Sequence, residues 1–417
     1  MTTVVPVLLL AVAVLGLLAP RLRTMSWLAP TACAAVAVVI GAVPGAAAGD
    51  SVRPLLAPLA FIVLAVPMAV MLDHYGLFEE LAGLVAGGPR YLGALWVLAA
   101  ATTAALNLDV AVVLLSPLYV RVADRRGEPR FVVALQPALL SSLASSGLPV
   151  SNLTNLIAAA HNHLSVGGFL VHLGPSTVVA TAVGWLCYRK GLRRIEAVMP
   201  GAPPGAAPGP AGAAGPVPPG RTRPRSRTLA VGGGLVVAVV VGFVAAPGVG
   251  GQPYEVAAVA DVVLLVLTRA APLRVVPWQS VGTVLGLGVL ASAAAEHLGV
   301  ARALGGSSLA GVARATVVSA AGANLVNNLP ALLVALPATG HRASWTLWAV
   351  LLGTNVGPLA VPSGSLAVLL WLETVRRLGL PVRDRDFLRV GWWIALPALL
   401  ASLATLLAVR VVLGPGH

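Results

Sequence analysis

Long apolar runs that are almost free of charge are the feature that most constrains the fold of this chain. A helix needs roughly 17 to 25 apolar residues to cross about 30 Å of hydrocarbon. Runs of about this length cover residues 4–19, 26–45, 53–72, 168–188, 229–246, 255–271, 280–296 and 390–413. Only 10% of the 417 residues are charged, against about 25% in a typical soluble domain. The sequence therefore predicts an all-α polytopic membrane protein and excludes soluble enzymes and disordered scaffolds.

The basic residues are expected to report the orientation in the membrane. The formal net charge of +13 would suggest nucleic-acid binding if it formed a patch interleaved with aromatic residues, but the arginines fall in short breaks between apolar runs, so we exclude a nucleic-acid partner. With five crossings in each half, 22 of the 27 Lys and Arg residues lie on one side and only Arg53, Arg302, Arg314, Arg342 and Arg410 on the other. Because basic residues accumulate in cytoplasmic loops, we predict a plasma-membrane protein with both termini outside.

A segment rich in proline and glycine divides the chain. Residues 199–227 read MPGAPPGAAPGPAGAAGPVPPGRTRPRSR, a composition that can neither pack a core nor hold a regular helix. We predict a first repeat over residues 1–190, a cytoplasmic linker over 191–228 and a second repeat over 229–417. The first apolar run lacks the basic residues that precede a signal peptide, so we expect it to be retained as a span.

Four apolar stretches are interrupted by polar residues, Gly or Pro at related places in the two halves. Stretches 91–120 and 307–338 contain NLDVAVVLLSP (107–117) and NNLPALLVALP (327–337), and stretches 131–163 and 344–375 contain SNLTN (151–155) and TNVGP (354–358). We interpret the first pair as re-entrant hairpins, facing the cytoplasm and the outside respectively, and the second pair as broken spans. The predicted fold has two inverted repeats, about ten transmembrane helices, two hairpins, and separate scaffold and transport parts.

The interruptions predict a binding site near the middle of the membrane. Irregular backbone is tolerated at that depth only where protein buries it or water lines it, and paired breaks in two inverted halves are typical of a transporter site. New half-helices are expected after Asn107, Asn152, Asn328 and Gly357, where their N-termini would favour anions or polarised oxygens. The candidate substrate-binding residues are Asn107, Asp109, Ser151, Asn152, Thr154, Asn155, Asn324, Asn327, Asn328, Thr354, Asn355, Ser363 and Ser365. The alternative is that these polar side chains only hold helices together.

Two carboxylates are expected deep in the membrane. A charged side chain there costs on the order of 2.5 to 3.5 kcal/mol on insertion scales and is normally functional. Asp109 lies beside a break and is a candidate for proton or ion coupling; alternatively, it caps a half-helix that starts at residue 110. Asp261 lies inside the run 255–271 without a break beside it. It is a second coupling candidate, or it pairs with a polar group of the scaffold.

Other motifs give no sign of an enzyme, a cofactor or a metal. His161 and His163 are two residues apart, so they point to different sides of a helix, and no HExxH sequence is present. We expect these histidines, with His172, at the outer mouth of the protein. No phosphate-binding GxxxxGK[ST] loop occurs, and Cys33 and Cys187 fall in separate apolar runs.

At the four interruptions the chain resembles the arsenite efflux permeases of the ion transporter superfamily, which also includes Na+/H+ antiporters and divalent anion:sodium symporters. The resemblance is carried by NLDVAVVLLSP (107–117), LPVSNLTNLI (148–157), GANLVNNLPALL (322–333) and GTNVGPLAVPSGSLAVLLWL (353–372). It implies two inverted repeats that move substrate by an elevator-like shift, often as a homodimer and sometimes with a partner ATPase. The motif positions carried over are Asn107, Asp109, Asn152, Thr154, Asn327, Asn328 and Asn355.

The function expected from these observations is secondary active export of a small inorganic solute, most simply arsenite or antimonite, coupled to protons or the membrane potential. Amides, hydroxyls and one carboxylate without a lysine or arginine suit a neutral polyhydroxyl or a small ion better than a dicarboxylate, which Asp109 would repel. The alternatives are a Na+/H+ antiporter and a carboxylate or sulfate symporter. Expected partners are the lipid bilayer, the inorganic substrate, and a proton or Na+.

Overall fold

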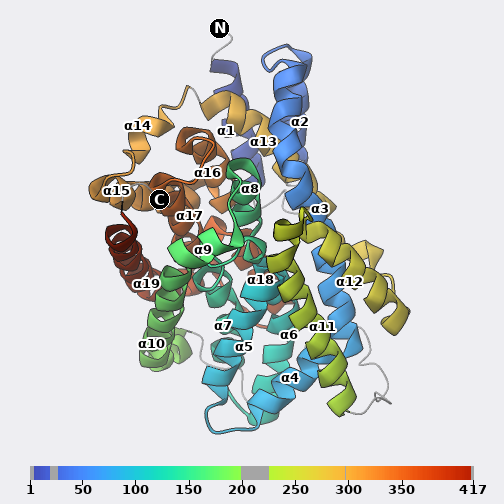
Figure 1. The fold of residues 1–417 in the computed structure, drawn as a ribbon. Helices are drawn as coiled ribbons and strands as arrows, with labels where there is room; N and C mark the ends of the chain where they lie inside the picture. Colours follow the sequence, from blue (N-terminus) through green and yellow to red (C-terminus); the bar gives the residue numbers. More distant parts are fainter. Residues whose placement is uncertain (1–3, 19–26, 199–224, 296, 415–417) are drawn as a thin grey trace.

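The computed structural model describes residues 4–18, 27–198, 225–295 and 297–414, and these form helices without a β-strand (Figure 1). The fold class predicted from the apolar runs is confirmed. Before the predicted linker the helices are α1 (Val4–Leu18), α2 (Leu28–Val39), α3 (Gly45–Tyr75), α4 (Leu77–Ala86), α5 (Tyr91–Leu106), α6 (Leu108–Arg126), α7 (Arg130–Leu143), the 3₁₀ turn η2 (Pro149–Ser151), α8 (Leu153–Asn162), α9 (Val166–His172) and α10 (Gly174–Val198).

The second half begins at α11, and most of the predicted linker, residues 199–224, lies outside the described residues. Its helices are α11 (Arg225–Ala245), η3 (Ala246–Val249), α12 (Pro253–Thr268), η4 (Leu273–Val275), α13 (Trp278–Ala295), α14 (Val300–Leu304), α15 (Leu309–Val326), α16 (Asn328–Ala335), η5 (Leu336–Thr339), α17 (Trp345–Val356), η6 (Gly357–Ala360), η7 (Pro362–Gly364), α18 (Leu366–Arg377) and α19 (Asp384–Leu413).

Long apolar helices supply the membrane-crossing part of the described chain. Five helical segments have the length and hydropathy of a span: Gly45–Tyr75, Ser226–Ala245, Leu273–Ala295, Leu309–Val326 and Asp384–Leu413. α9 and α10 pass the same test as a pair bent by 52°. α2, in the predicted span 26–45, has 12 residues, about 18 Å at 1.5 Å per residue, so the helix alone is shorter than the bilayer core. The total of about ten crossings stays a prediction.

Each of the four interrupted stretches is a pair of helices with a break between them. α5 and α6 meet at Asn107, and α15 and α16 meet at Asn327. α7 and α8 are separated by residues 144–152, and α17 and α18 by residues 357–365. The breaks therefore occur inside the predicted stretches, while the side of the membrane that each hairpin faces stays a prediction.

Two of the expected helix starts are wrong. α16 is capped by Asn327, so Asn328 is its first residue and not its cap. α18 begins only after Ser365, because Gly357 opens the 3₁₀ turn η6 and Pro362 opens a second turn, η7. Proline fits the first turn of a helix without losing a hydrogen bond. Pro358 lies in the first turn of η6 and Pro362 in that of η7, so two short turns precede α18.

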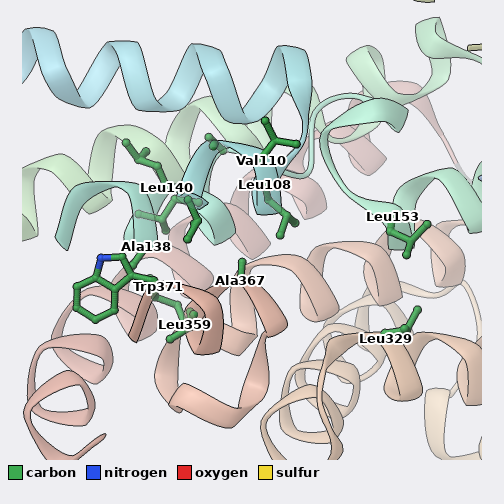
Figure 2. Close-up of a cluster of buried hydrophobic side chains, with 14 of the residues drawn as sticks. Leu108, Val110, Ala138, Leu140, Leu153, Leu329, Leu359, Ala367 and Trp371 are labelled. Carbon is green, nitrogen blue, oxygen red and sulfur yellow. The ribbon is translucent and has the colours of Figure 1, made fainter. Parts of the chain in front are cut away.

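Helices next to the breaks of the first half pack against helices of the second half. α6 packs against α18, and α8 contacts both α16 and α17. Figure 2 shows apolar residues of one buried cluster next to the breaks, among them Leu108 of α6, Ala367 of α18, Leu153 of α8 and Leu329 of α16. These side chains are at most 9% exposed, so the breaks sit in a packed interior.

Candidate functional site

Two asparagines with a left-handed backbone form the tips of the helix hairpins. Asn107 has a φ of 118° and caps α6, and its side-chain oxygen accepts a hydrogen bond from the backbone N–H of Asp109 at 2.9 Å. Asn327 has a φ of 84° and caps α16 in the same way, accepting from Leu329 N–H at 3.3 Å. With ψ of 150° and 153°, both residues occupy a positive-φ region that glycine adopts freely and that costs a residue with a Cβ about 1–3 kcal/mol. The proposed cap by Asp109 is wrong, because Asn107 holds that position.

The same two amides reach the broken spans. Asn107 Nδ2 lies 3.5 Å from the carbonyl oxygen of Val150, and Asn327 Nδ2 donates to that of Ser363 at 3.0 Å. Each carbonyl lies two residues before the residue that caps the next half-helix, Asn152 for α8 and Ser365 for α18. The two halves therefore repeat one local geometry, in which a hairpin tip is tied to the break of its own half.

Four predicted site residues form a hydrogen-bonded group that we call the amide node: Asn152, Thr154, Asn155 and Asn355. Asn355 Oδ1 accepts from Asn152 Nδ2 at 2.8 Å and from the hydroxyl of Thr154 at 3.0 Å, while Asn355 Nδ2 donates to Asn155 Oδ1 at 2.7 Å. All four side chains are at most 3% exposed. The node joins the end of α17 to the start of α8, so it links the two halves across the break.

Ser151 and, with its amide nitrogen, Asn155 of the node also bond to the chain just before η2. Ser151 donates to the carbonyls of Ser145 and Leu148, each at 2.6 Å, and Asn155 Nδ2 donates to the same two carbonyls at 2.8 and 2.9 Å. These bonds close the irregular segment between α7 and η2, whose serine run was not singled out from the sequence. Serines directly before a break were the available signal, because their backbone and side chains can satisfy unpaired groups.

The remaining candidates of the second half are arranged around η6 and η7. Asn324 Nδ2 donates to the carbonyls of Ala320 and Gly357, both at 2.8 Å. Thr354 donates to carbonyls of its own helix, α17. Asn328 and Ser365 are buried, Ser363 is half-buried, and the Ser365 side chain makes no cap hydrogen bond.

Unpaired oxygens remain beside the breaks. Asp109 Oδ1, Asn324 Oδ1, Thr103 Oγ1 and Ser146 Oγ are buried and have no hydrogen-bond partner. Thr103 and Ser146 were not predicted as site residues. No lysine or arginine belongs to the buried residues of the described chain. Because buried polar groups normally find a partner, these oxygens are left with an unused capacity to accept a hydrogen bond.

Asp261 lies apart from this arrangement. It is half-buried in α12, which packs mainly on α3, and its Oδ1 has no hydrogen-bond partner. The structure therefore groups the other candidates around the breaks and leaves Asp261 in a different helix pair.

A cavity of about 570 Å³ extends to the break of the first half. Its walls come from α3, the end of α11, the start of α12, and α8, and it reaches Ala105 and Val150 beside the hairpin tip. Phe61, Phe243 and Leu156 make much of the lining apolar, whereas Arg53 and His163 are basic residues in it. No carboxylate lines this cavity among the described residues.

The histidines lie near the ends of α8 and α9. The His161 ring lies 5.0 Å from the His341 ring, and the His172 ring stacks on Trp348 at 4.7 Å. Asn162 Nδ2 also donates to the carbonyl of Gly340 at 2.6 Å. The contacts of His161 and Asn162 join the end of α8 to the loop before α17, and that of His172 joins α9 to α17.

Comparisons with known proteins place the chain among membrane transporters. The family model described as "Citrate transporter" matches residues 1–353. The chain is 27% identical to the "Arsenical pump membrane protein" of Yersinia enterocolitica, over 94% of this chain and 95% of that protein. It is 28% identical to the protein of the same name from Escherichia coli (strain K12), over 84% of this chain and 85% of that protein. The "46 kDa membrane protein" of Mycobacterium leprae is 27% identical over 79% of this chain and 81% of that protein.

The resemblance found in the four motifs is confirmed by these relatives, and the multi-pass architecture agrees with them. The family model and the relatives identify a membrane transporter, and the described residues include five helices long and apolar enough to span a membrane. The chain belongs to the citrate transporter family of integral membrane proteins.

Proposed function

We propose that this protein exports arsenite, antimonite or a similar neutral inorganic hydroxide, with Asp109 as the group that couples export to protons or the membrane potential. The observation that carries the proposal is the set of unpaired buried oxygens at the breaks, where the described residues include no buried lysine or arginine. Arsenous acid is an uncharged trihydroxide at neutral pH, so its hydroxyl groups are donors for these acceptor oxygens. The names of the arsenical pump relatives agree with this substrate.

Citrate is the second candidate because the family model carries its name. A tricarboxylate in a buried site needs cationic partners, since the desolvation of each charge is costly when it is unpaired. The half-helix N-termini at Asn107, Asn152, Asn327 and Ser365 supply only partial positive charge. Asp109 adds a negative charge of its own when it is ionised. The site therefore favours a neutral solute over a tricarboxylate.

The transport step we propose is an elevator-like movement of the part that contains the four breaks. The caps and the amide node tie the hairpins and broken spans to one another, so these elements are suited to move together. The cavity lies between α8 on one side and α3 and α11 on the other, at the boundary where such a part would slide. The arginine distribution supports outside termini and a cytoplasmic linker, and the names of the arsenical pump relatives agree with export as the direction of transport.

The test is uptake into everted membrane vesicles. Arsenite, citrate and Na⁺ are offered separately while a proton gradient is imposed, and the expected result is accumulation of arsenite alone that a protonophore abolishes. Movement of citrate or Na⁺ without arsenite would overturn the substrate assignment.

Two variants, Asp109→Asn and Asp261→Asn, test which carboxylate couples export to the proton gradient. We expect Asp109→Asn to lower gradient-driven arsenite uptake at least tenfold at equal expression, and Asp261→Asn to retain uptake within about twofold of wild type. Unchanged uptake by Asp109→Asn would remove Asp109 from the coupling step while leaving the substrate assignment intact. Loss in Asp261→Asn alone would assign coupling to α12.

A further inference from the structure

A second hollow lies on the protein surface between α5 and α10, away from the breaks. Its volume is about 590 Å³, and its residues come from the start of α5 and from one face of α10. Leu92, Ala94, Val97 and Leu192 line it with apolar groups, and Val97 is 65% exposed. We call this hollow the α5–α10 groove. In a membrane an open apolar groove of this kind is a place for an acyl chain.

The charge of the α5–α10 groove is positive. Arg90 and Arg189 line it and are exposed. Neither arginine forms an ion pair with a carboxylate of the described chain, and no Asp or Glu lines the groove. On α10, Lys190 and Arg193 are also exposed close by. Two unpaired guanidinium groups beside an apolar groove match a phosphate attached to acyl chains, because guanidinium binds phosphate oxygens in pairs.

The wall of the groove is held in place by aromatic packing. The Trp185 ring lies 5.5 Å from Trp96 and stacks on Tyr188 at 5.8 Å. The Tyr188 hydroxyl donates to the carbonyl of Val132 at 2.8 Å and lies 3.2 Å from Gln136 Nε2. The guanidinium of Arg189 lies over Trp185, 5.7 Å from the ring centre. Trp96 and Tyr188 are buried and hold the wall in place, whereas Trp185 is half-buried and lines the groove, as expected of an aromatic residue near lipid headgroups.

We propose that the α5–α10 groove binds an anionic phospholipid, with its phosphate between Arg90 and Arg189 and an acyl chain along Leu92 and Val97. Basic pockets between membrane helices bind such headgroups. A second copy of the chain fits less well, because a two-fold interface sets the same patch against itself and would bring the arginines of both copies together. The proposal is independent of the transported solute.

The experiment compares phosphatidylglycerol with phosphatidylcholine of the same acyl chains, added to the purified full-length protein in detergent. Native mass spectrometry counts retained lipids, and the thermal unfolding midpoint is followed in parallel. For wild type we expect retention of phosphatidylglycerol and a higher midpoint, and little effect of phosphatidylcholine. The double variant Arg90→Gln, Arg189→Gln should weaken phosphatidylglycerol binding at least tenfold and lose the midpoint shift.

The matched control is Arg274→Gln, which removes an exposed arginine of η4 outside the groove and should respond to phosphatidylglycerol like wild type. If the double variant does not fold, Arg189→Gln alone is measured, with a smaller loss expected. Equal binding of both lipids, equal responses of the double variant and the control, or protection of the groove by a second copy in a dimer would each overturn the proposal.

Discussion

Asn355 donates a hydrogen bond from Nδ2 to Oδ1 of Asn155 at 2.7 Å, across 200 residues of sequence. The bond joins the end of α17 to the first turn of α8. Because Asn355 Oδ1 also accepts from Asn152 and Thr154, one side chain satisfies three polar groups of the other half. This makes Asn355 the centre of the amide node.

Replacement of Asn355 by alanine is expected to destabilise the protein strongly. It leaves the side chains of Asn152, Thr154 and Asn155 without their partner in a buried place, and each unsatisfied group costs about 1–3 kcal/mol. The unfolding midpoint of the purified variant in detergent should fall by several degrees, and transport should fall with it.

The adjacent residue supplies the control for that experiment. Thr354 is also fully buried, but its hydroxyl bonds only to carbonyls of α17. Thr354→Val keeps the shape of the side chain and should cost about 1 kcal/mol or less. Equal losses in the two variants would show that the node does not carry the stability assigned to it.

The positive φ of Asn107 predicts which of two variants, Asn107→Ala or Asn107→Gly, is the more stable. Asn107→Ala loses the helix cap and places a Cβ residue without local hydrogen bonding at a φ of 118°, whereas Asn107→Gly loses mainly the side-chain cap, since glycine adopts this φ freely. We expect the glycine variant to be more stable than the alanine variant by about 1 kcal/mol.

The same order is expected for glycine and alanine at Asn327, whose φ is 84°. Unfolding midpoints of the four variants test it. An alanine variant that matches or exceeds its glycine counterpart at both positions would contradict the role given to the left-handed backbone.

Close packing of α15 on α17 depends on Gly353. A Cβ at this position would lie 2.4 Å from the carbonyl oxygen of Thr316 and 2.1 Å from Ser319 Oγ. Gly353→Ala should therefore force the two helices apart and cost about 1–3 kcal/mol, seen as a lower unfolding midpoint. Gly322→Ala on α15 is the control, because its Cβ would meet only Ala331 at 3.7 Å, and it should leave the midpoint nearly unchanged.

The positive-inside argument predicts a location for the C-terminus. Arg410 Nε donates to the carbonyl of Ser307, and Arg314 Nη2 donates to that of Arg302, so three of the five arginines assigned to the outside lie around the start of α15. An alkaline phosphatase fused after residue 417 should be active, and a green fluorescent protein fused there should be dark. The reverse pair of results would invert the proposed topology.

Sequence patterns determined the helical membrane class and the positions of the four breaks. Apolar runs of membrane length that carry almost no charge require a lipid environment. Asn, Gly and Pro interrupt an apolar helix through their own backbone preferences, which depend only on neighbouring residues. The caps of α6 and α8 follow from the same local chemistry, since Asn107 and Asn152 directly precede apolar segments. The second half was predicted less well, because Pro358 and Pro362 each permit a new turn and local chemistry does not choose between them.

Only the tertiary structure decided which polar side chains meet. Asn355 could have faced substrate, lipid or another helix, and its bonds to Asn152, Thr154 and Asn155 depend on how α17 packs beside α8. The same packing leaves the Asp109 and Asn324 oxygens unpaired and holds Asp261 in a separate helix pair. Hydropathy and turn chemistry act over a few residues of chain, whereas the pairing of buried polar groups is settled by contacts between helices far apart in sequence.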